Sequence, residues 1–150
     1  MTPASLDLTV EGADGAGVDE RALRDLALVL LEAEGVDGSC ALGIAFVGEN
    51  EMQALNAEHR GLDEVTDVLA FPMDGRDELP PGLERQLGDV VVCRAQAVRQ
   101  AGEAGIEPLE EMRTLVVHGL LHLLGHDHEI DEGEMLARQD ELQAALPPLA

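Results

Sequence analysis

The residues best suited to chemistry in this 150-residue chain are the histidines between positions 118 and 128, where the sequence reads HGLLHLLGHDH. His118 and His122 are four residues apart, so on a helix they lie one turn above each other and can point at one ion. Gly125 is expected to end that helix, because glycine readily adopts the left-handed conformation found at helix ends. The chain can then fold back and bring His128 to the same ion. Three imidazoles with one position left for water are typical of catalytic zinc, so the spacing predicts a site for one zinc ion.

Two residues beside the predicted ligands have more than one interpretation. Asp127 is either a group that holds an imidazole N–H or a turn residue. His126 is either a fourth ligand or a residue that only lines the turn, and we favour the second. Imidazole also suits copper, iron and nickel, so zinc is the favoured metal among several.

The spacing of the histidines is also that of the long zinc-protease motif HExxHxxGxxH. In that motif the residue after the first histidine is a glutamate, which acts as the general base for peptide hydrolysis. This chain has Gly119 at that position. The sequence therefore predicts the metal ligands of a metallohydrolase without the base of a protease.

The composition restricts the kind of partner this chain can have. The net charge is −22, and all nine basic residues are arginines. Such a charge argues against nucleic-acid binding through a broad basic surface, but it allows a small site built from a metal ion and a few arginines. The chain has no apolar run long enough to span a membrane, and its first residues do not resemble a signal peptide. Cys40 and Cys93 lie in apolar stretches and are expected to be buried free thiols. We therefore expect a cytoplasmic protein without a membrane association.

The hydrophobic pattern predicts one α+β domain over residues 1–150, with helices packed on a four-stranded mixed sheet. The predicted strands are 5–10, 41–47, 66–71 and 87–93. The predicted helices are 19–35, 48–61, 94–105, 109–124 and 132–146, and the three-histidine site lies at the end of the fourth. Residues 11–17 are expected to form a turn. Residues 73–87 are expected to form a flexible loop, which is either a mobile lid near a site or a plain surface loop.

Four motifs taken together resemble a known family. LN-x-x-x-R-G, then TDVLAFP, then LGDVVV and the histidine motif occur in the order found in YbeY, a family of bacterial endoribonucleases and ribosomal-RNA maturation factors. The resemblance covers about residues 55–135. It implies a zinc-dependent enzyme that acts on single-stranded RNA in ribosomal-RNA processing and ribosome quality control. It also implies His118, His122 and His128 as zinc ligands, and Arg60 as a functional residue beside the metal.

This chain departs from the family pattern at three positions. His126 stands where the family usually has tyrosine, His59 where it usually has another aromatic residue, and Ala70 where serine is common. None of these changes removes a predicted zinc ligand or Arg60. His126 does introduce a further imidazole beside the predicted site.

The resemblance leads to a specific mechanism, metal-assisted hydrolysis of an RNA phosphodiester. We predict Arg60 and His118 as catalytic residues, with Arg60 also binding the substrate phosphate. Because the protein as a whole is acidic, local charge must bind RNA, and Arg94, Arg99 and Arg113 are further candidates for supplying it. The sequence does not distinguish water from the 2′-hydroxyl of RNA as the nucleophile.

Two other functions compete with this prediction. The first is a non-catalytic assembly factor that binds the small ribosomal subunit, with subunit proteins as candidate partners and zinc only holding the fold together. A structural zinc site normally has four protein ligands, so His126 as a fourth ligand would favour this alternative. The second is hydrolysis of another substrate, and Gly119 argues against peptides. Oligomeric state and the RNA cleavage site cannot be predicted from the sequence.

Overall fold

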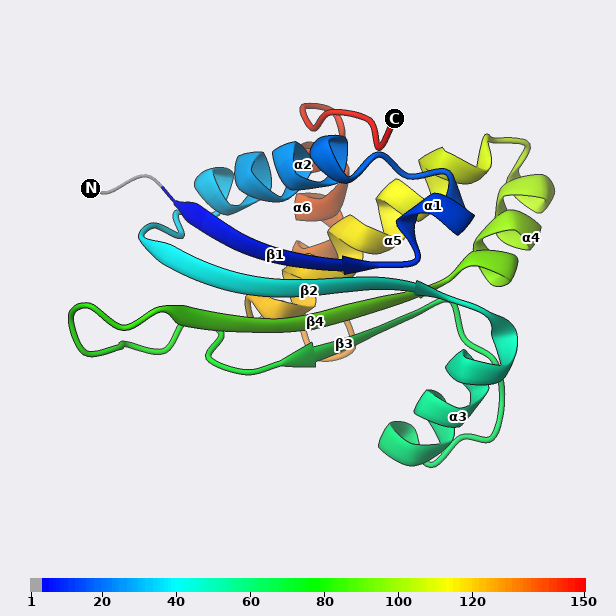
Figure 1. Cartoon of the computed structure of the whole chain (residues 1–150), viewed down its shortest axis with the longest axis horizontal. Coiled ribbons are helices and arrows are strands. Elements are labelled where there is room, and N and C mark those ends of the chain that lie inside the picture. Colours follow the sequence, from blue (N-terminus) through cyan, green and yellow to red (C-terminus); the bar gives the residue numbers. More distant parts are fainter. Residues whose placement is uncertain (1–3) are drawn as a thin grey trace.

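The strands form one mixed sheet in the order β1-β2-β4-β3 in the computed structural model, which describes residues 4–150 (Figure 1). Its strands are β1 (Ser5–Glu11), β2 (Ser39–Val47), β3 (Val68–Pro72) and β4 (Arg85–Cys93). β2 is parallel to both β1 and β4, whereas β3 is antiparallel to β4. This arrangement leaves β3 at an edge of the sheet, with one side free of strand partners. The predicted α+β class and the four-stranded mixed sheet are confirmed.

The two faces of the sheet support separate hydrophobic cores because alternate residues of its central strands point to opposite faces. Residues such as Ile44 and Val90 belong to the larger core, which α2 (Glu20–Ala33), α5 (Pro108–Leu123) and α6 (Glu134–Gln143) cover. Val47 and Val91 belong to a smaller core, which α3 (Glu49–Arg60) covers with the buried Met52. α4 (Arg94–Ala104) continues directly from β4 and contacts α5 (Figure 1).

Several helix and strand ends differ from the sequence-based predictions. Residues 11–17, predicted as a turn, contain the short helix α1 (Ala13–Ala16), which lies between two glycines of positive φ. The last helix is shorter than predicted, since the carboxylate of Asp131 accepts hydrogen bonds from the backbone N–H groups of Gly133 and Met135 and fixes where the helix begins.

Cys40 and Cys93 are buried free thiols, as predicted. Burial raises the pKa of the Cys40 thiol.

The segment between β3 and β4 was predicted as a loop of residues 73–87, but β4 already begins at Arg85. The Arg85 guanidinium donates to the carbonyl oxygens of Gly75 and Asp77, and the backbone N–H of Gln86 donates to the Asp74 carboxylate. These contacts hold the start of the loop against its own hairpin. None of residues 73–84 lines the cavity described below, so the position of this loop gives no support to the lid interpretation.

No helix among the described residues is both long enough and apolar enough to cross a membrane.

Candidate metal centre

Helix α5 carries two of the three predicted ligands, His118 and His122, toward its C-terminal end. Pro108 occupies its first turn, where the missing N–H of proline costs nothing. At the other end, the N–H of Gly125 donates to the His122 carbonyl and the N–H of His126 donates to the Leu121 carbonyl. With Gly125 at φ 93°, these two bonds make the glycine-terminated ending that the sequence predicts, one residue earlier than expected.

The three predicted ligands come together in space. The ligand atoms of His118, His122 and His128 all lie within 4.8 Å of one another. Their ring centroids are separated by 4.8 to 5.4 Å, and no pair of rings is stacked in parallel. No other group of three or more potential ligand residues occurs in the part of the chain that the structure describes. The arrangement of three converging imidazoles fits a single ion of the zinc type.

A buried glutamine fixes the orientation and proton position of the first ligand. The Nδ1 atom of His118 lies 2.7 Å from Oε1 of Gln139, on α6. An amide oxygen can only accept a hydrogen bond, so Nδ1 carries the proton and Nε2 keeps a free electron pair for a metal. At His122, burial is the main cause of a lowered pKa, and the neighbouring His118 and His128 lower the pKa further. Both effects favour the neutral form of the His122 imidazole, which metal binding requires.

The buried carboxylate of Glu34 holds the loop that supplies His128. The Glu34 side chain is only 6% exposed, and Nε2 of His126 lies 2.7 Å from its Oε1. Arg138 donates to the other oxygen at 2.7 Å, and Arg76 donates to Oε1 at 3.0 Å. Burial alone would raise the pKa of Glu34, but the hydrogen bonds from Arg138 and His126 outweigh burial and lower it. The His126 side chain therefore bonds to Glu34 and holds the loop, and it does not join the three predicted ligands. This agrees with the interpretation favoured from the sequence, in which His126 only lines the turn.

Asp127 also has a structural role in this loop. Its carboxylate accepts a hydrogen bond from the N–H of Glu129 at 3.0 Å, and its carbonyl accepts from the N–H groups of Ile130 and Asp131. These are the contacts of a turn residue. The group that orients an imidazole is Gln139 instead.

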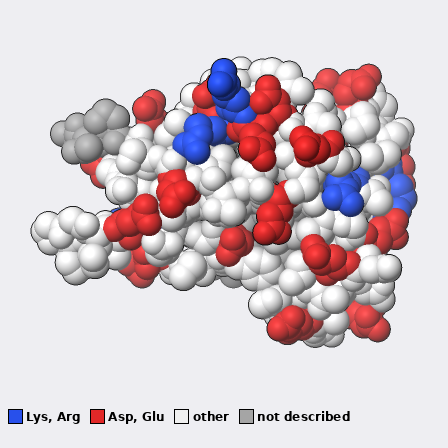
Figure 2. Space-filling model, in the orientation of Figure 1, with Lys and Arg blue, Asp and Glu red and all other residues white. Residues whose placement is uncertain are grey.

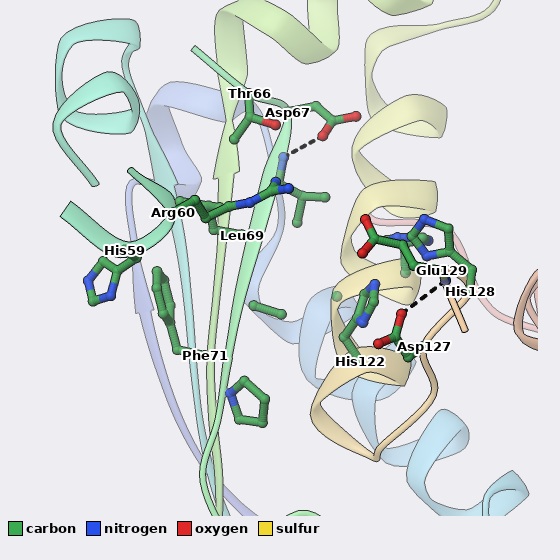
Figure 3. A pocket seen from close by; sticks show the side chains of 15 residues that line it. His59, Arg60, Thr66, Asp67, Leu69, Phe71, His122, Asp127, His128 and Glu129 are labelled. Carbon is green, nitrogen blue, oxygen red and sulfur yellow. Dashed lines mark hydrogen bonds between the residues drawn. The ribbon is translucent and has the colours of Figure 1, made fainter. Parts of the chain in front are cut away.

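A cavity of about 740 Å³ opens beside the histidines (Figure 3). Strand β3 forms one wall, the end of α3 with His59 and Arg60 forms another, and α5 with the loop after it forms the third. In Figure 3 the Arg60 side chain points from the end of α3 toward the side of the cavity that holds His122 and His128. Arg60 is exposed, and its side chain makes no hydrogen bond or ion pair with any described residue.

The other arginines considered for substrate binding are engaged elsewhere. Arg94 donates to the Phe46 carbonyl, Arg99 pairs with Glu49, and Arg113 donates to carbonyls near the C-terminus. None of these three lines the cavity, so the prediction that they contribute local charge there is not supported. Figure 2 shows that acidic side chains are spread over the face seen in Figure 1 and that basic ones are few. Arg60 is the arginine that lines the cavity.

Gly119 is explained by packing against the sheet. A Cβ atom at this position would lie 2.6 Å from Cγ1 and 3.0 Å from Cγ2 of Val90 on β4. Any larger residue would therefore require α5 or the Val90 side chain to shift, directly beside the predicted ligand His118. The glutamate of the protease motif therefore does not fit at this position without such a shift.

Comparisons with known proteins agree with this geometry. The family model described as "Endoribonuclease YbeY" matches residues 13–147. The chain belongs to the endoribonuclease YbeY family. A relative from Acidothermus cellulolyticus, named Endoribonuclease YbeY, is 46% identical over 151 aligned positions, which cover 92% of this chain and 91% of the relative. Another relative with the same name, from Macrococcus caseolyticus, is 42% identical, and the alignment covers 86% of this chain and 88% of the relative.

The fold is also similar to a solved structure. The solution structure of TM1509 from Thermotoga maritima matches with a TM-score of 0.58 at 25% identity, covering 91% of this chain and 87% of that protein. The family membership predicted from the sequence motifs is confirmed, and with it the assignment of the chain to a family of enzymes named for cutting RNA.

Sequence reasoning missed two supporting residues, Gln139 and Glu34. Gln139 lies between Met135 and Leu142 on the buried face of α6, and a polar residue at such a position needs a hydrogen-bonding partner. That spacing was a usable signal. Glu34 carried no comparable signal, because its partners come from positions 42 to 104 residues away in the chain.

Proposed function

We propose that this protein is a zinc-dependent endoribonuclease that cuts single-stranded RNA in ribosomal-RNA processing and ribosome maturation, in the cytoplasm. The observation that carries the proposal is one cavity that combines three converging histidines with an unpaired arginine. His118, His122 and His128 are assigned as ligands of one zinc ion, and Arg60 as the group that binds the scissile phosphate. Proteins of the small ribosomal subunit are candidate partners.

The donor set supports zinc on chemical grounds. Three imidazoles, one of them oriented by Gln139, provide nitrogen ligands and leave room for a further ligand. His128 is exposed, so the group is open toward the cavity rather than closed by protein. When bound, zinc would supply a Lewis acid and a water of lowered pKa, near 7 in known zinc hydrolases, which suits hydrolysis at neutral pH.

The charges of the cavity make the metal important for substrate binding too. Arg60 and the carboxylates of Asp67, Asp127 and Glu129 all line the cavity. One arginine among three carboxylates leaves this lining negative, which repels RNA phosphates. A divalent ion held by the histidines would bring the lining to about neutrality. We therefore expect RNA binding, and not only cleavage, to depend on the metal.

Arg60 has the properties expected of a phosphate-binding group. Its guanidinium keeps a positive charge at any relevant pH and can donate two parallel hydrogen bonds to phosphate oxygens. Because no described side chain pairs with it, it loses no internal ion pair when it binds a substrate. Placed on the developing negative charge, such a group would stabilise the transition state as well as the bound substrate.

The competing functions have less support. A structural zinc site would need a fourth protein ligand, and the further imidazole in the same loop, His126, is bonded to Glu34. A peptidase would need a glutamate where Gly119 packs against Val90. Neither alternative explains why an unpaired arginine lies in the same cavity as the histidines.

The experiment is cleavage of a single-stranded RNA by the purified protein, by the protein after chelation, and after zinc is added back. A His118→Ala variant tests for contaminating nucleases. We expect cleavage that disappears on chelation, returns with zinc and is absent in the variant. Cleavage that persists in the chelated protein or in the variant would refute the proposal.

A further inference from the structure

Two aromatic rings lie together in the cavity, on the other side of β3 from the histidines. His59, in the last turn of α3, and Phe71, on β3, have ring centroids 4.5 Å apart with planes inclined at 60°. Both residues line the cavity, and Figure 3 shows them side by side below Arg60. His59 is exposed and Phe71 is half-buried, so a ligand in the cavity can reach both.

Aromatic surface is scarce in this protein. The chain has two phenylalanines and neither tyrosine nor tryptophan. Phe46 is 2% exposed in the larger core, so Phe71 is the chain's one phenylalanine within reach of a ligand. Phe71 packs against the smaller core but is only partly buried there, so part of its ring remains open to the cavity.

The position of β3 connects this pair to the metal centre. Along the strand, Val68 and Ala70 pack toward the larger core and α5, whereas Leu69 and Phe71 pack toward the smaller core and α3. Because β3 is an edge strand, the cavity extends around its free side from the histidines to the aromatic pair. Arg60, adjacent to His59 in the sequence, lines the cavity with both groups.

We propose that His59 and Phe71 form a stacking platform for one unpaired base of the RNA strand whose phosphate lies at Arg60 and the histidines. This inference rests on the proposed function and adds to it the feature that selects single strands. Stacking on aromatic side chains is a common way to bind unpaired bases, and it requires no particular base because every base has a flat π face. A base in a duplex is already stacked and paired, so it reaches the platform only after the duplex opens.

The test compares two single-stranded DNA hexamers, which an endoribonuclease does not cut. One hexamer carries thymine at every position and the other carries abasic sites, so both have the same phosphate charge. Fluorescence anisotropy with zinc-loaded protein gives the affinity for each. We expect the thymine hexamer to bind about ten-fold more tightly, the size of effect that stacking of one base produces.

Variants assign that preference to the two rings. Phe71→Leu keeps the apolar contact with the smaller core, and His59→Ala removes the second ring; each should reduce the preference several-fold. Phe71→Tyr should keep it. Glu58→Ala, at the exposed neighbour of His59 outside the cavity, is the matched control and should leave the ratio of the two affinities unchanged. Zinc content and thermal unfolding of each variant establish that the fold is intact.

The outcomes separate this inference from the proposed function. Equal affinity for the two hexamers, including no measurable binding of either, would overturn the platform, as would a preference that survives both substitutions. If the same protein preparation cuts RNA in a zinc-dependent way while the hexamers bind equally, only the platform fails. If the base preference follows the two rings while RNA is never cut, the platform stands and the proposed nuclease activity fails.

Discussion

Replacing Gln139 with leucine should weaken zinc binding while leaving the metal-free protein folded. The Oε1 atom of Gln139 is the acceptor for the Nδ1–H of His118 at 2.7 Å, and Gln139 is only 9% exposed. Leucine has a similar size and suits the buried face that Met135 and Leu142 form on α6. The substitution therefore removes one hydrogen bond with little change in packing.

The magnitude follows from what the imidazole must do in each state. With zinc on Nε2, His118 has to keep its proton on Nδ1, and in the variant that buried donor has no partner, which costs about 1–3 kcal/mol. In the metal-free protein the proton can move to Nε2, which faces the open cavity, so most of this cost falls on the zinc-bound state. The expected result is a ten- to hundred-fold loss of zinc affinity, the usual range for groups that orient a metal-bound histidine.

The assay is competition for zinc with a chromophoric chelator, combined with thermal unfolding of the metal-free proteins. Gln143→Leu is the matched control, because this glutamine lies on the same helix but bonds to Thr114 at 2.9 Å. Gln139→Glu should keep or raise the affinity, since a carboxylate is the stronger acceptor. Unchanged zinc affinity in Gln139→Leu, or an equal loss in Gln143→Leu, would refute the role given to this hydrogen bond.

Three other predictions follow from packing, charge and metal binding. Gly119→Ala should destabilise the protein by about 1–3 kcal/mol through overpacking against Val90, whereas Gly102→Ala, a helix position with nothing within 4 Å, should be neutral or slightly stabilising in the same denaturant titration. Glu34→Gln should lower the free energy of unfolding by about 2 kcal/mol at pH 7. Because the folded-state pKa of Glu34 is lowered, its contribution to stability is present above the unfolded pKa near 4.5 and is lost as the pH falls through the folded pKa. The difference between wild type and variant should therefore shrink in acid, and a difference that is constant from pH 7 to pH 3 would contradict this reasoning, with Glu32→Gln, at an exposed neighbour, as the control. Chelation should lower the melting temperature, since an ion that binds only the folded protein stabilises it; calorimetry with and without zinc would test this, and an unchanged melting temperature would count against metal binding.

Much of the fold could be predicted from local patterns, because each strand and each long helix carries its own signal. Alternation in residues 5–10 and the apolar run of 41–47 predicted β1 and β2 to within two residues at each end. The helix predicted from residue 19 is α2, and the carboxylate of Asp19 caps it by accepting a hydrogen bond from the N–H of Arg21. Helix α1 was missed because four residues between two glycines carry no periodic pattern.

The predicted ligands of the site could be read from the sequence, but the groups that hold them in place could not. The histidine spacing and Gly125 indicated the three converging imidazoles, since both features are local. The hydrogen-bond partners of His118 and His126 are Gln139 and Glu34. They were not predictable, because they depend on how α6 and the end of α2 pack against α5 and the loop after it. The same holds for Arg94, Arg99 and Arg113: their charge is visible in the sequence, but their hydrogen-bond partners appear only in the fold.

The rate of RNA cleavage and the zinc content of an Arg60→Ala variant, measured together, separate phosphate binding from metal binding. Arg21→Ala is the control, because Arg21 is also exposed and has no side-chain hydrogen bond or ion pair with any described residue, but it lies outside the cavity. If Arg60 binds the phosphate beside a separate metal group, Arg60→Ala keeps one zinc ion per protein and loses cleavage by at least about a hundred-fold, as for other groups that stabilise transition-state charge, while Arg21→Ala retains both. Full cleavage by Arg60→Ala, or loss of its zinc together with its activity, would contradict the proposed role of Arg60 in binding the phosphate.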